Sequence, residues 1–283
     1  MPYTLKNAHL AQRGALVVLV GCGGTGGFVA EGLARLFLAL GRQDIRLVLV
    51  DHDTVEERNL LRQNFLRDDL GRYKAQALAE RLARQYGQPV GYSLEPVLSD
   101  GHGSDIPRGA ALVIGAVDNH LARAGLAWHV RPPSDYASGS WWVDAGNAES
   151  FGQVVIGNAD SDELEGAFDE PTGICYKLPK PTVQVPELLA PPLPEVLDPN
   201  DPSCAVLVEM GQQSPVINQM MAALVLEVVR QLLLGKLQWM RVDLDLERGE
   251  MRPLYATPEN AAKAAGLRVR QLLAKAKKTE ERR

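Results

Sequence analysis

The sequence predicts an α/β fold in which a mostly parallel, doubly wound sheet carries helices on both faces. Three observations predict it. An apolar run over residues 15–20 stops at a cluster of glycines, a helical pattern of apolar residues follows from Thr25, and a second apolar run over residues 45–50 ends at Asp51. Further short apolar runs over residues 90–97, 111–116, 141–145 and 152–157 supply the remaining expected strands.

Composition excludes several classes of protein. The chain has 283 residues, 46% of them hydrophobic, and a net charge of −5, which argues against a general nucleic-acid-binding protein. It contains no run of about 18 apolar residues and no signal-peptide layout, so we expect a cytoplasmic protein without a membrane partner. Three cysteines and no Cys-x-x-Cys pair argue against a disulfide framework and a four-cysteine zinc site.

The glycine cluster predicts a nucleotide site. Gly21, Gly23 and Gly26 would let backbone amides approach a phosphate at the start of the following helix, and Asp51 could accept hydrogen bonds from ribose hydroxyls. A dehydrogenase that uses NAD would show the same unit. The additional Gly24 and a second carboxylate at Asp53 argue against NAD as the ligand.

The polar segment after Asp51 offers candidate phosphate contacts. Arg62 could clamp a triphosphate, because a guanidinium group suits phosphate oxygens, but a solvated helical turn with ordinary salt bridges fits its spacing equally well. Lys74 begins a helical pattern, where a positive charge opposes the helix dipole. It is a candidate contact for the β- and γ-phosphates, and a surface lysine is an equally good interpretation.

A carboxylate follows the strand expected at residues 111–116. In an open α/β sheet, ligands bind at the carboxyl ends of the strands, so Asp118 could hold Mg²⁺ or activate a group. Asn119 could instead cap the helix that begins there and carries Arg123.

The second half of the chain changes in character. Residues 158–215 are rich in proline and predict a long, extended excursion from the sheet, with candidate nucleophiles at Cys175 and Cys204. An ordinary unreactive thiol is the commoner outcome for a lone cysteine. A helix over residues 215–234, a hairpin over residues 239–255 and a basic, solvated helical tail over residues 258–283 complete the prediction.

Five motifs occur in order: GCGGTG, DHD, ERNLLRQNF, DLGRYKA and AVDNHLAR. Together they resemble the E1-like adenylyltransferases of the ThiF/MoeB type, and residues 209–233 extend the resemblance to about residue 255. Within that family the chain looks most like the ThiF-like proteins of the PRTRC group. The resemblance implies a Rossmann-like adenylation domain over residues 1–257, with a crossover loop at 158–215 and a C-terminal antiparallel hairpin, followed by the tail at 258–283.

The resemblance also implies a reaction. The family activates the C-terminal glycine carboxylate of a ubiquitin-like β-grasp protein, which attacks the α-phosphate of ATP to give an acyl-adenylate and pyrophosphate. Asn59, Arg62 and Lys74 would neutralise the triphosphate, Gln63 would support the pocket, and Asp118 would coordinate Mg²⁺. The implied nucleotide site comprises Gly21, Gly23, Gly24, Gly26, Asp51, Asp53, Asn59, Gln63 and Lys74.

Partners follow from the same resemblance. Relatives are usually homodimers. Some transfer the activated carboxylate to a cysteine and then to an E2-like protein. Here Cys204 is the preferred candidate for that cysteine and Cys175 is the second. The zinc-binding cysteine pairs of relatives are missing, so no zinc is expected, and Arg13 is the only arginine near the N-terminal arm. Alternatives are an activator of a sulfur-carrier protein, an enzyme that adenylates a peptide or a tRNA base, and a non-catalytic scaffold.

Overall fold

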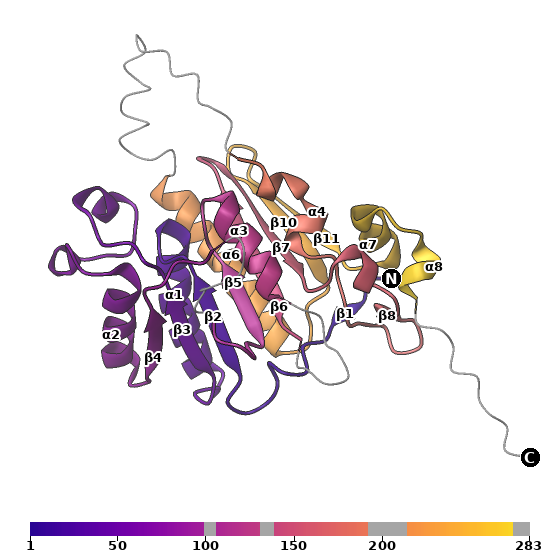
Figure 1. The fold of residues 1–283 in the computed structure, drawn as a ribbon, viewed down its shortest axis with the longest axis horizontal. Coiled ribbons are helices and arrows are strands. Elements are labelled where there is room, and N and C mark those ends of the chain that lie inside the picture. Colours follow the sequence, from indigo (N-terminus) through magenta and orange to yellow (C-terminus); the bar gives the residue numbers. More distant parts are fainter. Residues whose placement is uncertain (99–105, 131–138, 192–213, 274–283) are drawn as a thin grey trace, which may run out of the picture.

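The computed structural model describes residues 1–98, 106–130, 139–191 and 214–273, and its centre is an eight-stranded sheet (Figure 1). The strands lie in the order β11, β10, β7, β6, β5, β2, β3, β4. Their bounds are β2 (Leu16–Val20), β3 (Arg46–Val50), β4 (Val90–Ser93), β5 (Leu112–Gly115), β6 (Trp141–Asn147), β7 (Phe151–Gly157), β10 (Trp239–Asp245) and β11 (Glu250–Tyr255).

The sheet is parallel from β6 to β4 and antiparallel from β6 to β11. All five residues of β2 are buried, as expected for a parallel strand that is covered on both faces. The expected α/β class, the mostly parallel sheet and the C-terminal hairpin are confirmed. The predicted strand at residues 90–97 is shorter, because β4 ends at Ser93.

Helices cover both faces of the sheet (Figure 1). One face packs against α1 (Gly24–Ala39), α2 (Lys74–Tyr86) and α6 (Pro215–Leu233), which contribute Leu33, Leu78 and Val225 to one core cluster. The other face packs against α3 (His120–His129), which contributes Leu126 to a second cluster. Two 3-10 helices, η1 (Glu57–Leu61) and η2 (Arg67–Asp69), lie between β3 and α2.

The segment after β7 is folded onto the body of the protein. A small second sheet joins β1 (Thr4–Leu5), β9 (Ile174–Cys175) and β8 (Phe168–Asp169), and η3 (Ser161–Glu163), α4 (Pro181–Gln184) and η4 (Pro186–Leu189) complete the segment. The segment leaves the eight-stranded sheet, as predicted, but up to residue 191 it is packed into short elements and is not extended. Pro181 and Pro186 stand in the first turns of short helices, where proline is tolerated. Residues 192–213, which include Cys204, lie outside the described residues.

The C-terminal part is also packed. Residues 258–272 form α7 (Pro258–Ala265) and α8 (Val269–Leu272), and Ala261, Ala262 and Leu272 are buried in the main core cluster. The expected solvated helix is thus wrong here, because a small apolar face among the lysines and arginines is enough for packing. The domain division at residue 257 stays a prediction.

One described helix, α6, is long and apolar enough to cross a membrane, with 19 residues and a mean hydropathy of 1.4. Half of its most apolar window is buried, and α6 packs against α1. These contacts are those of a core helix.

Candidate active site

The candidate site is a hollow of about 1200 Å³ at the carboxyl ends of the parallel strands. Its lining includes the loop after β2, the ends of β3 and β5, η1, the start of α2 and the β6–β7 hairpin, together with the segment after β4, the first turn of α3 and part of η4. The lining includes most of the residues that the sequence predicted for the site: Gly21, Gly23, Gly24, Asp51, Asp53, Asn59, Arg62, Gln63, Lys74 and Asp118. Gly26 and the exposed Arg13 are outside it.

The positions of the loop require glycine for different structural reasons. Gly21 has a φ of 88°, and a β-carbon there would lie 2.4 Å from the carbonyl oxygen of Ala116. A β-carbon at Gly26 would lie 1.8 Å from the carbonyl oxygen of Gly21. Gly23 meets nothing closer than 3.7 Å, so its backbone is open to the hollow. The loop therefore places the start of α1 at the wall of the hollow, as an anion site requires.

The start of α1 also contacts α6. A β-carbon at Gly24 would lie 2.5 Å from Nδ2 of Asn218, which is fully buried. The Thr25 hydroxyl donates to Oδ1 of Asn147 at 3.0 Å, and Asn147 Nδ2 donates to Oδ1 of Asn218 at 3.2 Å. This network fixes the loop to α6 and to the β6–β7 hairpin.

Asp51 holds the glycine loop directly. Its carboxylate accepts hydrogen bonds from the backbone amides of Cys22 at 2.6 Å and Asp53 at 2.9 Å. Burial raises the pKa of Asp51, although these two hydrogen bonds act in the opposite direction. The sequence predicted a ribose contact for Asp51 but not this bond to the loop.

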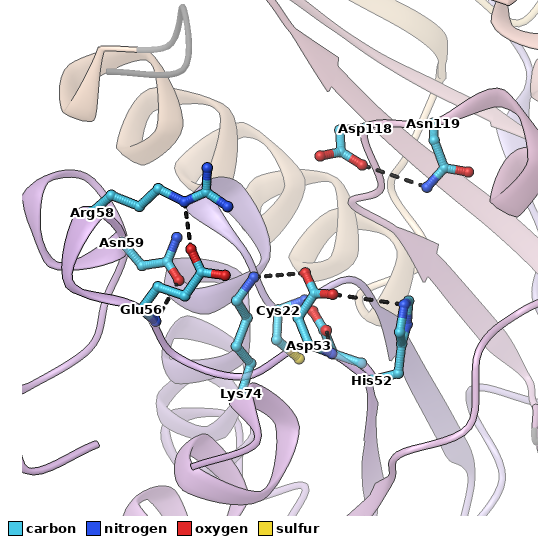
Figure 2. Close-up of polar contacts among 10 residues, drawn as sticks. Cys22, His52, Asp53, Glu56, Arg58, Asn59, Lys74, Asp118 and Asn119 are labelled. Carbon is cyan, nitrogen blue, oxygen red and sulfur yellow. Dashed lines mark hydrogen bonds and ion pairs between the residues drawn. The ribbon is translucent and has the colours of Figure 1, made fainter. Parts of the chain in front are cut away.

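Lys74 is not a surface lysine. Its side chain is 9% exposed, and Nζ donates to Oδ2 of Asp53 at 2.8 Å (Figure 2). Burial would raise the pKa of Asp53, but the hydrogen bond and charge of Lys74 outweigh it and hold that pKa below its ordinary value. The Lys74–Asp53 pair thus places a cation and an anion together at the beginning of α2.

One group of side chains has the spacing of a cation site. Ligand atoms of Asp51, His52 and Asp53 all lie within 4.8 Å of one another. The Nε2 atom of His52 is 3.6 Å from Oδ1 of Asp53. Exposed acidic groups often adopt such spacing without binding an ion, so this group carries no assignment.

The segment around η1 forms another wall of the hollow. Asn59 is buried, and its Oδ1 accepts a hydrogen bond from the backbone amide of Glu56 at 2.9 Å, which fixes the turn. Gln63 is also buried, and its Oε1 has no hydrogen-bond partner among the described residues. Burial lowers the pKa of Arg62, and the charge of Asp118 acts in the opposite direction. Arg62 and Asp118 therefore interact across the hollow.

Asp118 lies on the loop that follows β5. It is exposed, and Asn119 Nδ2 donates to its Oδ1 at 3.5 Å. Figure 2 shows Asp118 and Asn119 on one side of the site and Arg58 and Asn59 on the other. Asn119 also caps α3, since its Oδ1 accepts from the amide of Ala122 at 2.8 Å.

The described cysteines are buried. Cys175 is fully buried, its thiol donates to the carbonyl oxygen of Lys177 at 3.2 Å, and burial raises its pKa. A thiol in this state is inert, which agrees with the commoner outcome expected for a lone cysteine and contradicts the candidate role of Cys175 as an exposed nucleophile. Cys22 is fully buried in the glycine loop, and burial raises its pKa as well. Cys204 lies outside the described residues.

One pair of charges in the site was missed. Arg123 on α3 lines the hollow, and its Nε atom donates to the fully buried Asp144 of β6 at 3.2 Å. Burial raises the pKa of Asp144, and the charge of Arg123 opposes that rise. The available sequence clue was the Asp-Asn-x-x-x-Arg spacing, which ends at Arg123.

Comparisons with known proteins agree with this architecture. The model of the ThiF family matches residues 8–258. E. coli MccB solved with ATP is 18% identical with a TM-score of 0.56, and the match covers 88% of this chain and 66% of MccB. The microcin C7 biosynthetic enzyme MccB in complex with N-formylated MccA gives 18% identity, a TM-score of 0.58 and the same coverage.

PaaA is 18% identical with a TM-score of 0.57, and the match covers 89% of this chain and 75% of PaaA. At these identities the likeness shows the fold. The chain spans about 66% of the length of MccB. No curated protein matches the chain.

Proposed function

This chain belongs to the ThiF family, and from that premise we propose that it is an ATP-dependent adenylyltransferase acting on the C-terminal carboxylate of a protein or peptide. The observation that carries the proposal is the meeting of five groups in one hollow. The glycine loop, Asp51, Arg62, Lys74 and Asp118 come from separate parts of the chain and all line it.

The hollow fits a nucleoside triphosphate. The open backbone at Gly23 and the start of α1 suit phosphate oxygens. Asp51 can accept from ribose hydroxyls while it holds the loop. Arg62 and Lys74 supply positive charge for the triphosphate, and Asn59 and Gln63 complete that wall. The E. coli MccB structure with ATP supports a nucleotide as ligand of this fold.

The proposed reaction needs positioning and charge compensation. A carboxylate oxygen of the substrate forms a bond to the α-phosphorus, and the bond from that phosphorus to the oxygen bridging to the β-phosphorus breaks. Pyrophosphate leaves with the electron pair, and the other product is an acyl-adenylate. Arg62 and Lys74 would stabilise the charge that develops on the phosphates.

Asp118 is the residue we assign to Mg²⁺, which supplies additional positive charge for the phosphates when it is bound. A carboxylate on an exposed loop at the end of a central strand suits a hard cation that keeps several waters. Asp53 pairs with Lys74 and positions that lysine within the site.

The finer proposal concerns the partner. The motifs of the chain resemble enzymes that activate the terminal glycine of a ubiquitin-like β-grasp protein, and we propose that class of substrate, a homodimeric enzyme and transfer through Cys204 to an E2-like acceptor. The PRTRC-type assignment and the sulfur-carrier alternative belong to the same proposal, since they differ only in the partner. A non-catalytic scaffold would have no use for Arg62, Lys74 and Asp118 together in one hollow.

A second candidate is adenylation of a short peptide. Its support is the fold shared with MccB, the microcin C7 biosynthetic enzyme that was solved with N-formylated MccA.

Exchange of labelled pyrophosphate into ATP tests the function. It should be supported by β-grasp proteins that end in glycine and abolished when their terminal carboxylate is converted to an amide. Exchange with short free peptides alone would favour the second candidate. Exchange at the wild-type rate in Arg62→Ala would contradict the triphosphate assignment.

A further inference from the structure

Arg123 lines the hollow with a guanidinium group of which only the Nε atom donates a hydrogen bond among the described residues. The residue is 9% exposed, and its Nε atom is bound to Asp144. No hydrogen bond of either Nη atom is found among the described residues, although Arg123 lines the hollow. Arg123 therefore has donor groups that are fixed in direction and have no acceptor within the part of the chain that the structure describes.

Neutralising Asp144 does not explain this arrangement. A buried ion pair is weak evidence for stability, since desolvation of both charges offsets their attraction. Both carboxylate oxygens of Asp144 accept from the Nε atom of Arg123. A lysine could also neutralise Asp144. What the arginine adds is a rigid fork whose outer donors suit a planar, two-oxygen anion.

Strand β6 leaves the fork accessible. Gly146 lines the hollow beside Arg123, and a β-carbon there would lie 3.3 Å from Nη2. That distance is tighter than most real contacts, so any larger residue would crowd the guanidinium group. The glycine keeps the approach along the β6–β7 hairpin open.

We propose that Arg123, held in place by Asp144, binds the C-terminal carboxylate of the protein or peptide substrate. This inference rests on the proposed adenylyltransferase function and adds the residue that receives the second substrate. The assignment separates two anion sites, one for the triphosphate at Arg62 and Lys74 and one for the carboxylate at Arg123.

The dimensions of the hollow support two substrates. Pockets that hold one small ligand typically measure roughly 300–1,000 Å³, and this one measures about 1200 Å³. On the side of Arg123 its wall includes the exposed side chains of Leu121 and Phe151 together with Leu188. An extended chain end could lie against these apolar groups with its carboxylate at Arg123.

The test uses the peptide Ala-Ala-Gly-Gly with a free carboxylate and the same peptide as its C-terminal amide. Both are titrated into the protein saturated with Mg²⁺ and AMPCPP. Binding is measured by calorimetric titration in every variant, and in the wild type the NMR signals of the arginine Nε–H groups show whether Arg123 is the contact. Arg123→Lys keeps a charge beside Asp144 but removes the fork, and Gly146→Ala keeps the fork but crowds Nη2. Arg241→Lys is the matched control, because Arg241 pairs with Asp243 at 2.8 Å outside the hollow.

We expect the free acid to bind at least ~10-fold more tightly than the amide, as lost charge-assisted hydrogen bonds require. Arg123→Lys and Gly146→Ala should both weaken binding of the free-acid peptide and leave the affinity for AMPCPP unchanged. Arg241→Lys should change neither affinity. Equal affinities for acid and amide, no binding of the acid, or wild-type affinity in both hollow variants would overturn the inference. Failure of the wild type to bind AMPCPP would instead contradict the proposed function.

Discussion

The backbone amide of Cys22 lies 2.6 Å from a carboxylate oxygen of Asp51, and this contact joins the end of β3 to the glycine loop on β2. The other oxygen of Asp51 accepts from the amide of Asp53. One carboxylate therefore sets the position of both loops that would surround a nucleotide. Loss of that carboxylate should therefore destabilise the glycine loop even when no ligand is present.

Asp51→Ala should lower the free energy of unfolding by about 1–3 kcal/mol, because two backbone amides lose their acceptor. It should also lower the affinity for MgATP. Urea unfolding measures the first effect and calorimetric titration the second. The control is His52→Ala, whose exposed side chain should change the free energy of unfolding by less than about 0.5 kcal/mol. Equal unfolding energies for the two variants would show that the Asp51–Cys22 contact stabilises nothing.

Two adjacent glycines should respond differently to the same change. Gly24→Ala places a methyl group 2.5 Å from Nδ2 of Asn218 and should lower the free energy of unfolding by about 1–3 kcal/mol. Gly23→Ala meets nothing closer than 3.7 Å, so its fold should be intact while MgATP affinity falls. Thermal unfolding and MgATP titration of both variants separate packing from binding. An unstable Gly23→Ala would mean that this side of the loop is closed.

The Lys74–Asp53 pair predicts a dependence on pH. The pKa of Asp53 lies below its ordinary value of 3.8, so the stability contributed by its ionised form is present above that pH and is lost as the pH falls through the lower, folded-state pKa. Asp53→Asn should therefore lose less stability than the wild type on acidification from about pH 5 to pH 3. Parallel curves for the two proteins would contradict the pairing.

The buried thiols should be unreactive in the folded protein. Peptide mapping after brief treatment with iodoacetamide should find Cys22 and Cys175 unmodified under native conditions and modified in denaturant, because both are fully buried with raised pKa values. Rapid native alkylation of Cys175 would contradict its placement.

The two candidate nucleophiles can be separated in the same way. Cys175→Ala should leave any thioester formation unchanged, whereas Cys204→Ala should remove it and leave adenylation intact. Thioester formation that persists in Cys204→Ala would contradict the proposal that Cys204 is the nucleophile.

The sequence predicted the strands and helices around the site because each has a strong local pattern. The apolar run of β2 and the glycine loop are contiguous in the chain, so their proximity needs no long-range information. The packing of residues 158–191 was missed because it depends on contacts with β1, at the other end of the chain. Short two-residue strands have no periodicity of their own.

The sequence predicted individual site residues better than it predicted their hydrogen-bond partners. The position of Lys74 at a helix start was evident, but its hydrogen bond to Asp53 crosses 21 residues and depends on how α2 meets β3. Arg123 stood in a motif, whereas its partner Asp144 lay within an apolar run that indicated only a strand. A buried charge inside such a run is a local conflict of the kind that marks functional sites.

Thermal unfolding of the wild type and of Asp118→Ala, with MgATP and with NAD, distinguishes an adenylation site from a dinucleotide site. A ligand that binds only the folded state adds about 2.7 kcal/mol at 100 times its dissociation constant. We expect MgATP to stabilise the wild type, NAD to have no effect, and Asp118→Ala to keep its fold but lose the MgATP stabilisation. Stabilisation by NAD alone would contradict the account and make the glycine loop part of a dinucleotide site.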